Sequence, residues 1–147
     1  MATTNASITI SSSDIIPGMA MNYYKTATLF KAGGCAGLEK IQSGTIEYTQ
    51  ATIALLLDQS QITGVTADKA NKLYIRNLST DSTEYATITI NSEELGRLYA
   101  GDFMWMPWSP KAQHVNDLEI TPSVATGMHI EFMAIHNFAN IYPNSAD

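Results

Sequence analysis

Apolar and polar residues alternate along much of the chain, and this pattern predicts β-strands. Successive side chains of a strand point to opposite faces, so a period of two indicates sheets that bury one face. Residues 71–78 and 84–90 show the pattern most clearly, and the polar loop Ser79–Thr83 between them predicts a β-hairpin. The residues expected to point inward are Leu73, Ile75, Ala86, Ile88 and Ile90. Those expected to point outward are Tyr74, Arg76, Tyr85, Thr87 and Thr89.

Two other segments carry strand patterns. Residues 128–137 place Met128, Ile130, Phe132 and Ala134 on one face of a single strand. Residues 44–57 change phase partway, which indicates either a β-bulge near residue 50 or two strands that meet there. A helix over residues 51–58 is the competing interpretation, but the β-branched residues around it favour strand.

The segment 97–108, called the aromatic segment below, contains both tryptophans of the protein. In an extended chain Phe103 and Trp105 share one face, and Met104, Met106 and Trp108 share the other. Both faces are apolar, so the strand needs cover on two sides, and a second subunit is a candidate for one of them. We therefore expect this segment to serve as core or as a subunit interface, and we expect Pro107 at a strand end or sheet edge. The residues concerned are Tyr99, Phe103, Trp105, Pro107 and Trp108.

The chain divides into three predicted parts: an extended N-terminal arm (1–20), a single β-domain (21–140) and a loose tail (141–147). A short strand is expected within the arm, which is either a frayed terminus with an edge strand or an arm that lies on a neighbouring subunit. Residues 21–30 predict a further strand, and residues 91–97 predict one helical turn with Ser92 as its N-cap. The polar residues 111–120 argue against a central strand there, except at the end of that stretch.

Short strands separated by turns, with almost no helical periodicity, predict an all-β fold. The expected architecture is an antiparallel β-sandwich, most simply a jelly roll, and an open β-barrel is the alternative.

Composition narrows the classes of function. The 147 residues have a formal net charge of −6, and the 8 basic residues form no stripe, which argues against nucleic acid and anionic membranes as partners. Charged residues make up 15%, below the roughly 25% of an average domain. Cys35 is the single cysteine, so no internal disulfide forms. No signal peptide and no apolar run of about 20 residues is evident, which predicts a soluble protein made in a cytoplasm.

Candidate chemistry is sparse. The histidines are His114, His129 and His136, and of these only His129 shares a strand face with a carboxylate, that of Glu131. A zinc site needs three or four ligands, and the glycine-rich residues 32–37 lack a phosphate-binding pattern. We therefore expect no catalytic, cofactor or metal site and no enzymatic activity. A sugar-stacking platform made by Tyr99, Phe103, Trp105 and Trp108 and a metal-dependent cupin-like enzyme remain alternatives.

Residues 71–77, 96–103 with Pro107-Trp108, and 117–120 to 128–131 resemble small structural proteins of tailed bacteriophages, nearest to the capsid cement (decoration) proteins. The resemblance covers about half of the chain, residues 71–137. It implies a protein on the outside of the virion head, commonly a trimer, that clamps neighbouring capsomers of the major capsid protein.

The leading hypothesis is thus a non-enzymatic capsid cement protein that acts as a homo-oligomer, with a trimer favoured, on the head surface after synthesis in the bacterial host cytoplasm. Its N-terminal arm is expected to contact the capsid through Ile8, Ile10, Ile15 and Ile16. The alternatives are a phage tail, baseplate or spike-tip component, and a carbohydrate-binding β-sandwich module.

Overall fold

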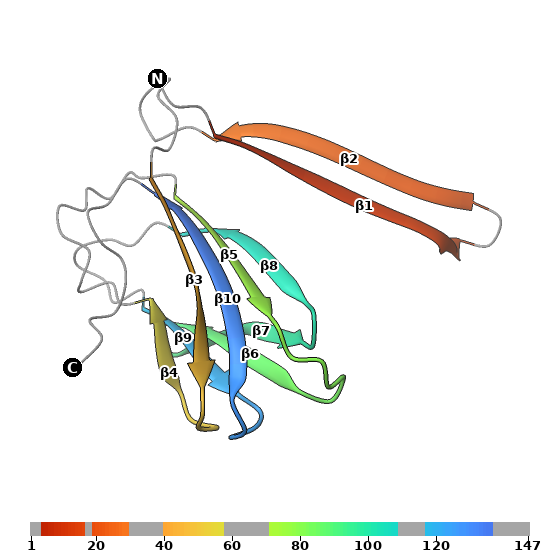
Figure 1. Cartoon of the computed structure of the whole chain (residues 1–147). Coiled ribbons are helices and arrows are strands. Elements are labelled where there is room, and N and C mark those ends of the chain that lie inside the picture. Colours follow the sequence, from red (N-terminus) through yellow and green to blue (C-terminus); the bar gives the residue numbers. More distant parts are fainter. Residues whose placement is uncertain (1–3, 17–18, 30–39, 58–70, 109–116, 137–147) are drawn as a thin grey trace.

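The protein folds into two four-stranded antiparallel sheets with a long hairpin that extends away from them (Figure 1). The computed structural model describes residues 4–16, 19–29, 40–57, 71–108 and 117–136. Every strand pairing among these residues is antiparallel. The predicted all-β antiparallel sandwich is therefore confirmed. In the same residues no helix is long and apolar enough to cross a membrane.

Each sheet has four strands. The first sheet has the order β3 (Lys40–Tyr48), β10 (Met128–His136), β5 (Lys72–Asn77) and β8 (Phe103–Pro107). The second has the order β4 (Ala54–Leu57), β9 (Leu118–Pro122), β6 (Tyr85–Ile90) and β7 (Glu93–Tyr99). The pairings nest along the chain, because β3 pairs with β10, β4 with β9, β5 with β8 and β6 with β7. The segment 44–57 thus holds the end of β3 and the whole of a separate strand, β4, as one of its two interpretations predicted.

The core lies between the two sheets and is built from the alternating apolar positions. The predicted inward residues of β5, β6 and β10 are fully or almost fully buried, with Ile90 half-buried at the end of β6. Thr89 was expected to point outward and is buried instead. The register of β6 against β7 shifts between Ile88 and Thr89, so the strict alternation ends there.

The expected hairpin between residues 71–78 and 84–90 is wrong, because β5 and β6 lie in different sheets. Both strands point their apolar residues into the same core, so alternation alone does not distinguish a hairpin from a connection between sheets. Asn77 ends β5 at this crossing and is buried. Its side-chain Nδ2 donates to the Leu98 carbonyl of the second sheet at 3.0 Å, and its Oδ1 accepts from the backbone N–H of Ser79 at 2.9 Å.

One further expectation is wrong in the second sheet. Asn91 and Ser92 do not begin a helical turn but form the tight turn between β6 and β7, with φ values of 51° and 66°. Two positive φ values are typical of a type I′ turn, which matches the twist of a hairpin. A strand was allowed only at the end of residues 111–120, and β9 (Leu118–Pro122) begins at that end. It lies between β4 and β6 and buries Leu118 and Ile120, while Glu119 faces outward.

The hairpin that leaves the sandwich consists of β1 (Thr4–Ile16) and β2 (Met19–Leu29), called the N-terminal hairpin below (Figure 1). Its register pairs Ala6 with Ala27, Ile8 with Lys25 and Ile10 with Tyr23. The expected boundary between residues 20 and 21 falls inside β2. Cys35, His114 and the predicted tail 141–147 lie outside the described residues.

Candidate binding groove

The aromatic segment is divided between the core and the surface. Trp108 is 3% exposed and belongs to the core, and the half-buried Met104 and Met106 pack against that core. Pro107 is the last residue of the edge strand β8, as predicted. Tyr99 is exposed at the end of β7, where its ring lies 5.3 Å from that of Tyr85. On β8, the face that carries Met104 and Met106 packs on the core, so a site on this strand has to use the opposite face.

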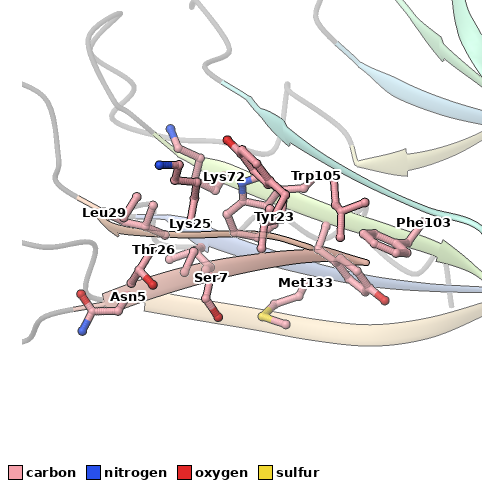
Figure 2. A pocket seen from close by; sticks show the side chains of 16 residues that line it. Asn5, Ser7, Tyr23, Lys25, Thr26, Leu29, Lys72, Phe103, Trp105 and Met133 are labelled. Carbon is pink, nitrogen blue, oxygen red and sulfur yellow. The ribbon is translucent and has the colours of Figure 1, made fainter. Parts of the chain in front are cut away.

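That other face carries Phe103 and Trp105, which point away from the core toward the N-terminal hairpin (Figure 2). Phe103 is 60% exposed, whereas Trp105 is half-buried. Register places Trp105 opposite Tyr74 and Tyr74 opposite Met133, so these side chains form one row across three strands. The second cover that we expected for the aromatic segment is therefore supplied, in part, by the same chain.

The N-terminal hairpin has one apolar and one polar face, because its two strands alternate in phase. The apolar face is formed by Ala6, Ile8 and Ile10 of β1 with Met21, Tyr23, Lys25, Ala27 and Leu29 of β2. The polar face carries serine, threonine and asparagine together with the exposed Tyr24, and Thr28 Oγ1 donates there to Asn5 Oδ1 at 2.9 Å. A ribbon with this pattern is expected to place its apolar face on another apolar surface.

The base of the N-terminal hairpin packs its apolar face on the outer face of the first sheet. Leu29 and Ile135 are buried against each other, and Ala6, Trp105 and Met133 pack around them. Ile135 and Met133 are the outward residues of β10, so this small cluster joins the hairpin to the outer face of the first sheet. Beyond it the hairpin leaves the sheet, and Ile8 and Ile10 are 41% and 51% exposed.

The hairpin and the sheet enclose a groove of about 670 Å³ between them (Figure 2). Its hairpin wall is formed by Asn5, Ala6, Ser7, Ile8, Ile10, Tyr23, Lys25, Thr26, Ala27 and Leu29. Its sheet wall is formed by Lys72, Tyr74, Phe103, Trp105, Met133 and Ile135. This volume lies within the 300–1,000 Å³ of sites that hold small ligands, so the groove accepts a few large side chains or a small molecule.

The two lysines supply the charge in the groove. Lys25 Nζ lies 5.8 Å from the centroid of the Tyr23 ring, a distance at which a cation and an aromatic face attract each other. Lys72 belongs to the sheet wall. The remaining lining is aromatic, aliphatic or uncharged polar, so the groove is suited to apolar and stacking contacts and carries two cations.

The described candidates for a metal or acid site, His129 and Glu131, are not part of the groove lining. His129 is exposed on β10 with Glu47 as its register partner on β3, and Glu131 is on the same face. Among the described residues no group of three or more His, Cys, Asp or Glu side chains is placed to hold a metal ion.

Comparisons with protein-family models, with curated proteins and with solved structures find no match. The groove and its two walls are therefore the features from which a function is inferred.

Sequence reasoning found Phe103, Trp105, Ile8 and Ile10 but not the surface that they form together. It did not identify Tyr23, Tyr74, Met133 or Ile135 as partners in that surface. One signal was available: in residues 128–135 the odd positions Met133 and Ile135 are apolar as well as the even ones. A strand that is apolar on both faces needs other apolar residues to cover each face. This applies to the strand over residues 128–135 as well as to β8.

Proposed function

We propose that the protein is a non-enzymatic structural protein of a bacteriophage, a capsid cement protein that stabilises the head by clamping neighbouring capsomers as an oligomer. The observation that carries the proposal is the N-terminal hairpin, which projects from a rigid sandwich with its apolar face largely uncovered. Large exposed apolar surfaces of this kind are typical of contacts between proteins. The resemblance of residues 71–137 to cement proteins points the same way.

The topology supports the proposal at the level of fold. We infer a jelly roll. In that fold four nested antiparallel strand pairs are rolled into two sheets, and the eight strands from β3 through β10 form four pairs that nest in this way. Jelly rolls form viral capsid domains, and also lectins and cupins. Since one fold serves several functions, the assignment depends on the surface of the hairpin more than on the sheets.

Such a protein stabilises the head by burying additional surface at the boundaries between neighbouring capsomers. A contact of standard size buries about 1,600 Å² in total. An oligomer, for which we favour a trimer, makes several contacts at once, and the second and third contacts form at high effective concentration. We propose that the tip of the hairpin, where Ile15 and Ile16 end β1, reaches the major capsid protein on the outside of the head.

Binding to purified heads tests the proposal directly. Heads that lack the protein are mixed with it, sedimented and analysed for its ratio to the major shell protein, and DNA release on heating is followed by dye fluorescence. We expect binding that saturates at a fixed ratio and a higher temperature of DNA release. Failure to bind heads, or binding without any change in head stability, contradicts the cement role.

The place of the protein on the particle separates the two virion roles. Antibody labelling of intact particles is expected to mark the head surface. Label confined to the tail or baseplate would assign the protein to the tail, baseplate or spike tip instead.

A carbohydrate-binding module is the second candidate, because aromatic rings gather in the groove. The rings of Tyr74 and Phe103 lie 5.9 Å apart, and Trp105 is adjacent. Trp108, one of the four residues considered for a sugar platform, is excluded from that role because it is buried in the core. A glycan-array signal that Phe103→Ala removes, and that Tyr99→Ala outside the groove retains, would favour this function.

A further inference from the structure

We propose that the groove between the N-terminal hairpin and the first sheet is the self-association site of the protein, and that its occupant is the N-terminal hairpin of a second copy. The inference deepens the oligomeric part of the proposed function by naming its contact surface, but it does not require a capsid.

The first step concerns the hairpin alone. Two strands without further partners are marginally stable in water. Only the base of this hairpin is packed on the sandwich, through Leu29 and Ala6. Farther along, the apolar side chains of Ile8, Ile10 and Tyr23 are each more than 40% exposed. The projecting part of the ribbon therefore gains stability from any apolar surface that covers this face.

The second step identifies which surface fits. Within one chain the apolar face of the hairpin already packs on the outer face of the first sheet, where Leu29 contacts Ile135 beside Trp105. The uncovered part of the same sheet face continues through Tyr74 to Phe103, which is 60% exposed. The uncovered part of the hairpin is of the same chemistry as its packed base. The hairpin of a second copy would pack on the uncovered end of this sheet face, near Phe103. That contact has the same chemistry as the one that the chain's own hairpin makes near Ile135.

The third step is one of size. The groove of about 670 Å³ takes a few large side chains and not a folded domain. The apolar face of a hairpin presents such a set in one row, with isoleucines on β1 and with Met21 and Tyr23 on β2.

The buried area is sufficient for a stable contact when the exchange is mutual. The part of the ribbon beyond its packed base is about 30 Å long and about 10 Å wide, so its uncovered face offers roughly 300 Å². If each copy both donates its hairpin and receives one, a reciprocal pair buries at most on the order of 1,200 Å² in total, which is the lower end of the roughly 1,200–2,000 Å² of stable interfaces. In a ring of three, each copy likewise donates one hairpin and receives one.

The first test compares two variants on neighbouring residues of β1. Ile10→Asp places a carboxylate on the apolar face, and Thr9→Asp makes the same charge change on the polar face. We expect the wild type and Thr9→Asp to be oligomers by size-exclusion chromatography with light scattering, and Ile10→Asp to associate at least about tenfold more weakly, because an unpaired charge is costly to bury. Circular dichroism confirms that each sandwich is folded. A monomeric wild type, or equal association of the two variants, overturns the proposal.

The second test does not depend on destabilising the contact. In a Cys35→Ser background, tagged Ile10→Cys and untagged Phe103→Cys chains are co-expressed and treated with a short bismaleimide. We expect a cross-linked species that contains one tagged and one untagged chain. Tagged Thr9→Cys in place of Ile10→Cys is expected to give much less of it. Absence of the mixed species, or equal yields from both positions, contradicts contact between the hairpin of one copy and the groove of another.

Head binding is measured in parallel, so that the two proposals fail separately. An oligomeric wild type that cross-links as expected but does not bind heads removes the cement role and leaves the contact between copies. A strictly monomeric protein whose Ile10→Asp variant loses head binding would instead assign the groove to a capsid protein.

Discussion

At the scale of single residues, the two tryptophans show how one sequence pattern leads to different environments. Trp105 and Trp108 are three positions apart and lie on opposite faces of the extended segment. Trp108 completes the core, whereas Trp105 lies under the base of the N-terminal hairpin. The opposition of the two faces was predictable from the period of a strand. The cover over Trp105 was not, because it comes from residues almost one hundred positions earlier in the chain.

Substitution of the small buried residue Asn77 is expected to lower the free energy of unfolding markedly. Its buried amide joins the two sheets by donating to the Leu98 carbonyl and accepting from the backbone N–H of Ser79. Asn77→Ala leaves both backbone groups without this partner, so we expect the free energy of unfolding to fall by about 1–3 kcal/mol. Urea denaturation measures it, with the exposed Asn22→Ala on the hairpin as control. A change below about 0.5 kcal/mol would show that water replaces the amide without loss.

Tyr48 is expected to make stability sensitive to alkaline pH. Its buried hydroxyl donates to the Leu55 carbonyl at 3.1 Å, and burial raises the pKa of this phenol well above its ordinary value of 10.0. The folded state therefore keeps Tyr48 neutral while the unfolded chain ionises. The stabilisation is complete below pH 10 and is lost as pH rises from there toward the folded pKa, at up to about 1.4 kcal/mol per pH unit.

The variant Tyr48→Phe separates this effect from those of the other tyrosines. At pH 7 we expect it to be less stable by about 0.5–1.5 kcal/mol, because one hydrogen bond is lost. Above pH 10 its free energy of unfolding should fall less steeply than that of the wild type. Parallel curves for the two proteins would mean that Tyr48 ionises without unfolding.

At the scale of elements, the direction of side chains was predictable and the pairing of strands was not. Each inward position of β5 and β10 follows from alternation over a few residues. Pairing is decided between residues far apart, so β5 was assigned to β6 when its partners are β10 and β8. For a related reason, a strand was allowed only at the end of residues 111–120, where β9 begins. Glu119 is polar, but it faces outward between Leu118 and Ile120, which face the core.

The turn between β6 and β7 offers a test of local backbone strain. Ser92 has a φ of 66°, a conformation that a side chain with a Cβ disfavours and glycine adopts readily. Asn-Gly is also the preferred pair for a type I′ turn. We expect Ser92→Gly to raise the free energy of unfolding by about 0.4–1 kcal/mol and Ser92→Val to lower it, as measured by urea denaturation. Destabilisation by glycine would indicate that the Ser92 side chain makes a contact worth more than the strain.

At the scale of the whole molecule, the sandwich and the hairpin have different sources of stability. The sandwich buries two inner faces against each other and needs no partner. The hairpin has one packed end and one exposed apolar face, so its order is tied to what covers it. From the sequence, an extended N-terminal element could be predicted from its alternation. A strand over residues 21–30 was also predicted and corresponds to β2. The pairing of β1 with β2, and the apolar face that they form together, were not predicted, because that face becomes visible only when the two strands are placed in register.

If a second copy covers that face, unfolding must be coupled to dissociation. The temperature of unfolding should then rise with protein concentration, because mass action favours the associated folded state. For a chain of this size, about 1 kcal/mol corresponds to 2–4 °C, so we expect a rise of about 1–4 °C for each tenfold increase in concentration. Ile10→Asp should unfold at one temperature at all concentrations, whereas Thr9→Asp should follow the wild type. Differential scanning fluorimetry over a hundredfold range measures all three proteins. A wild type whose unfolding temperature is independent of concentration would show that the hairpin contact contributes nothing to stability.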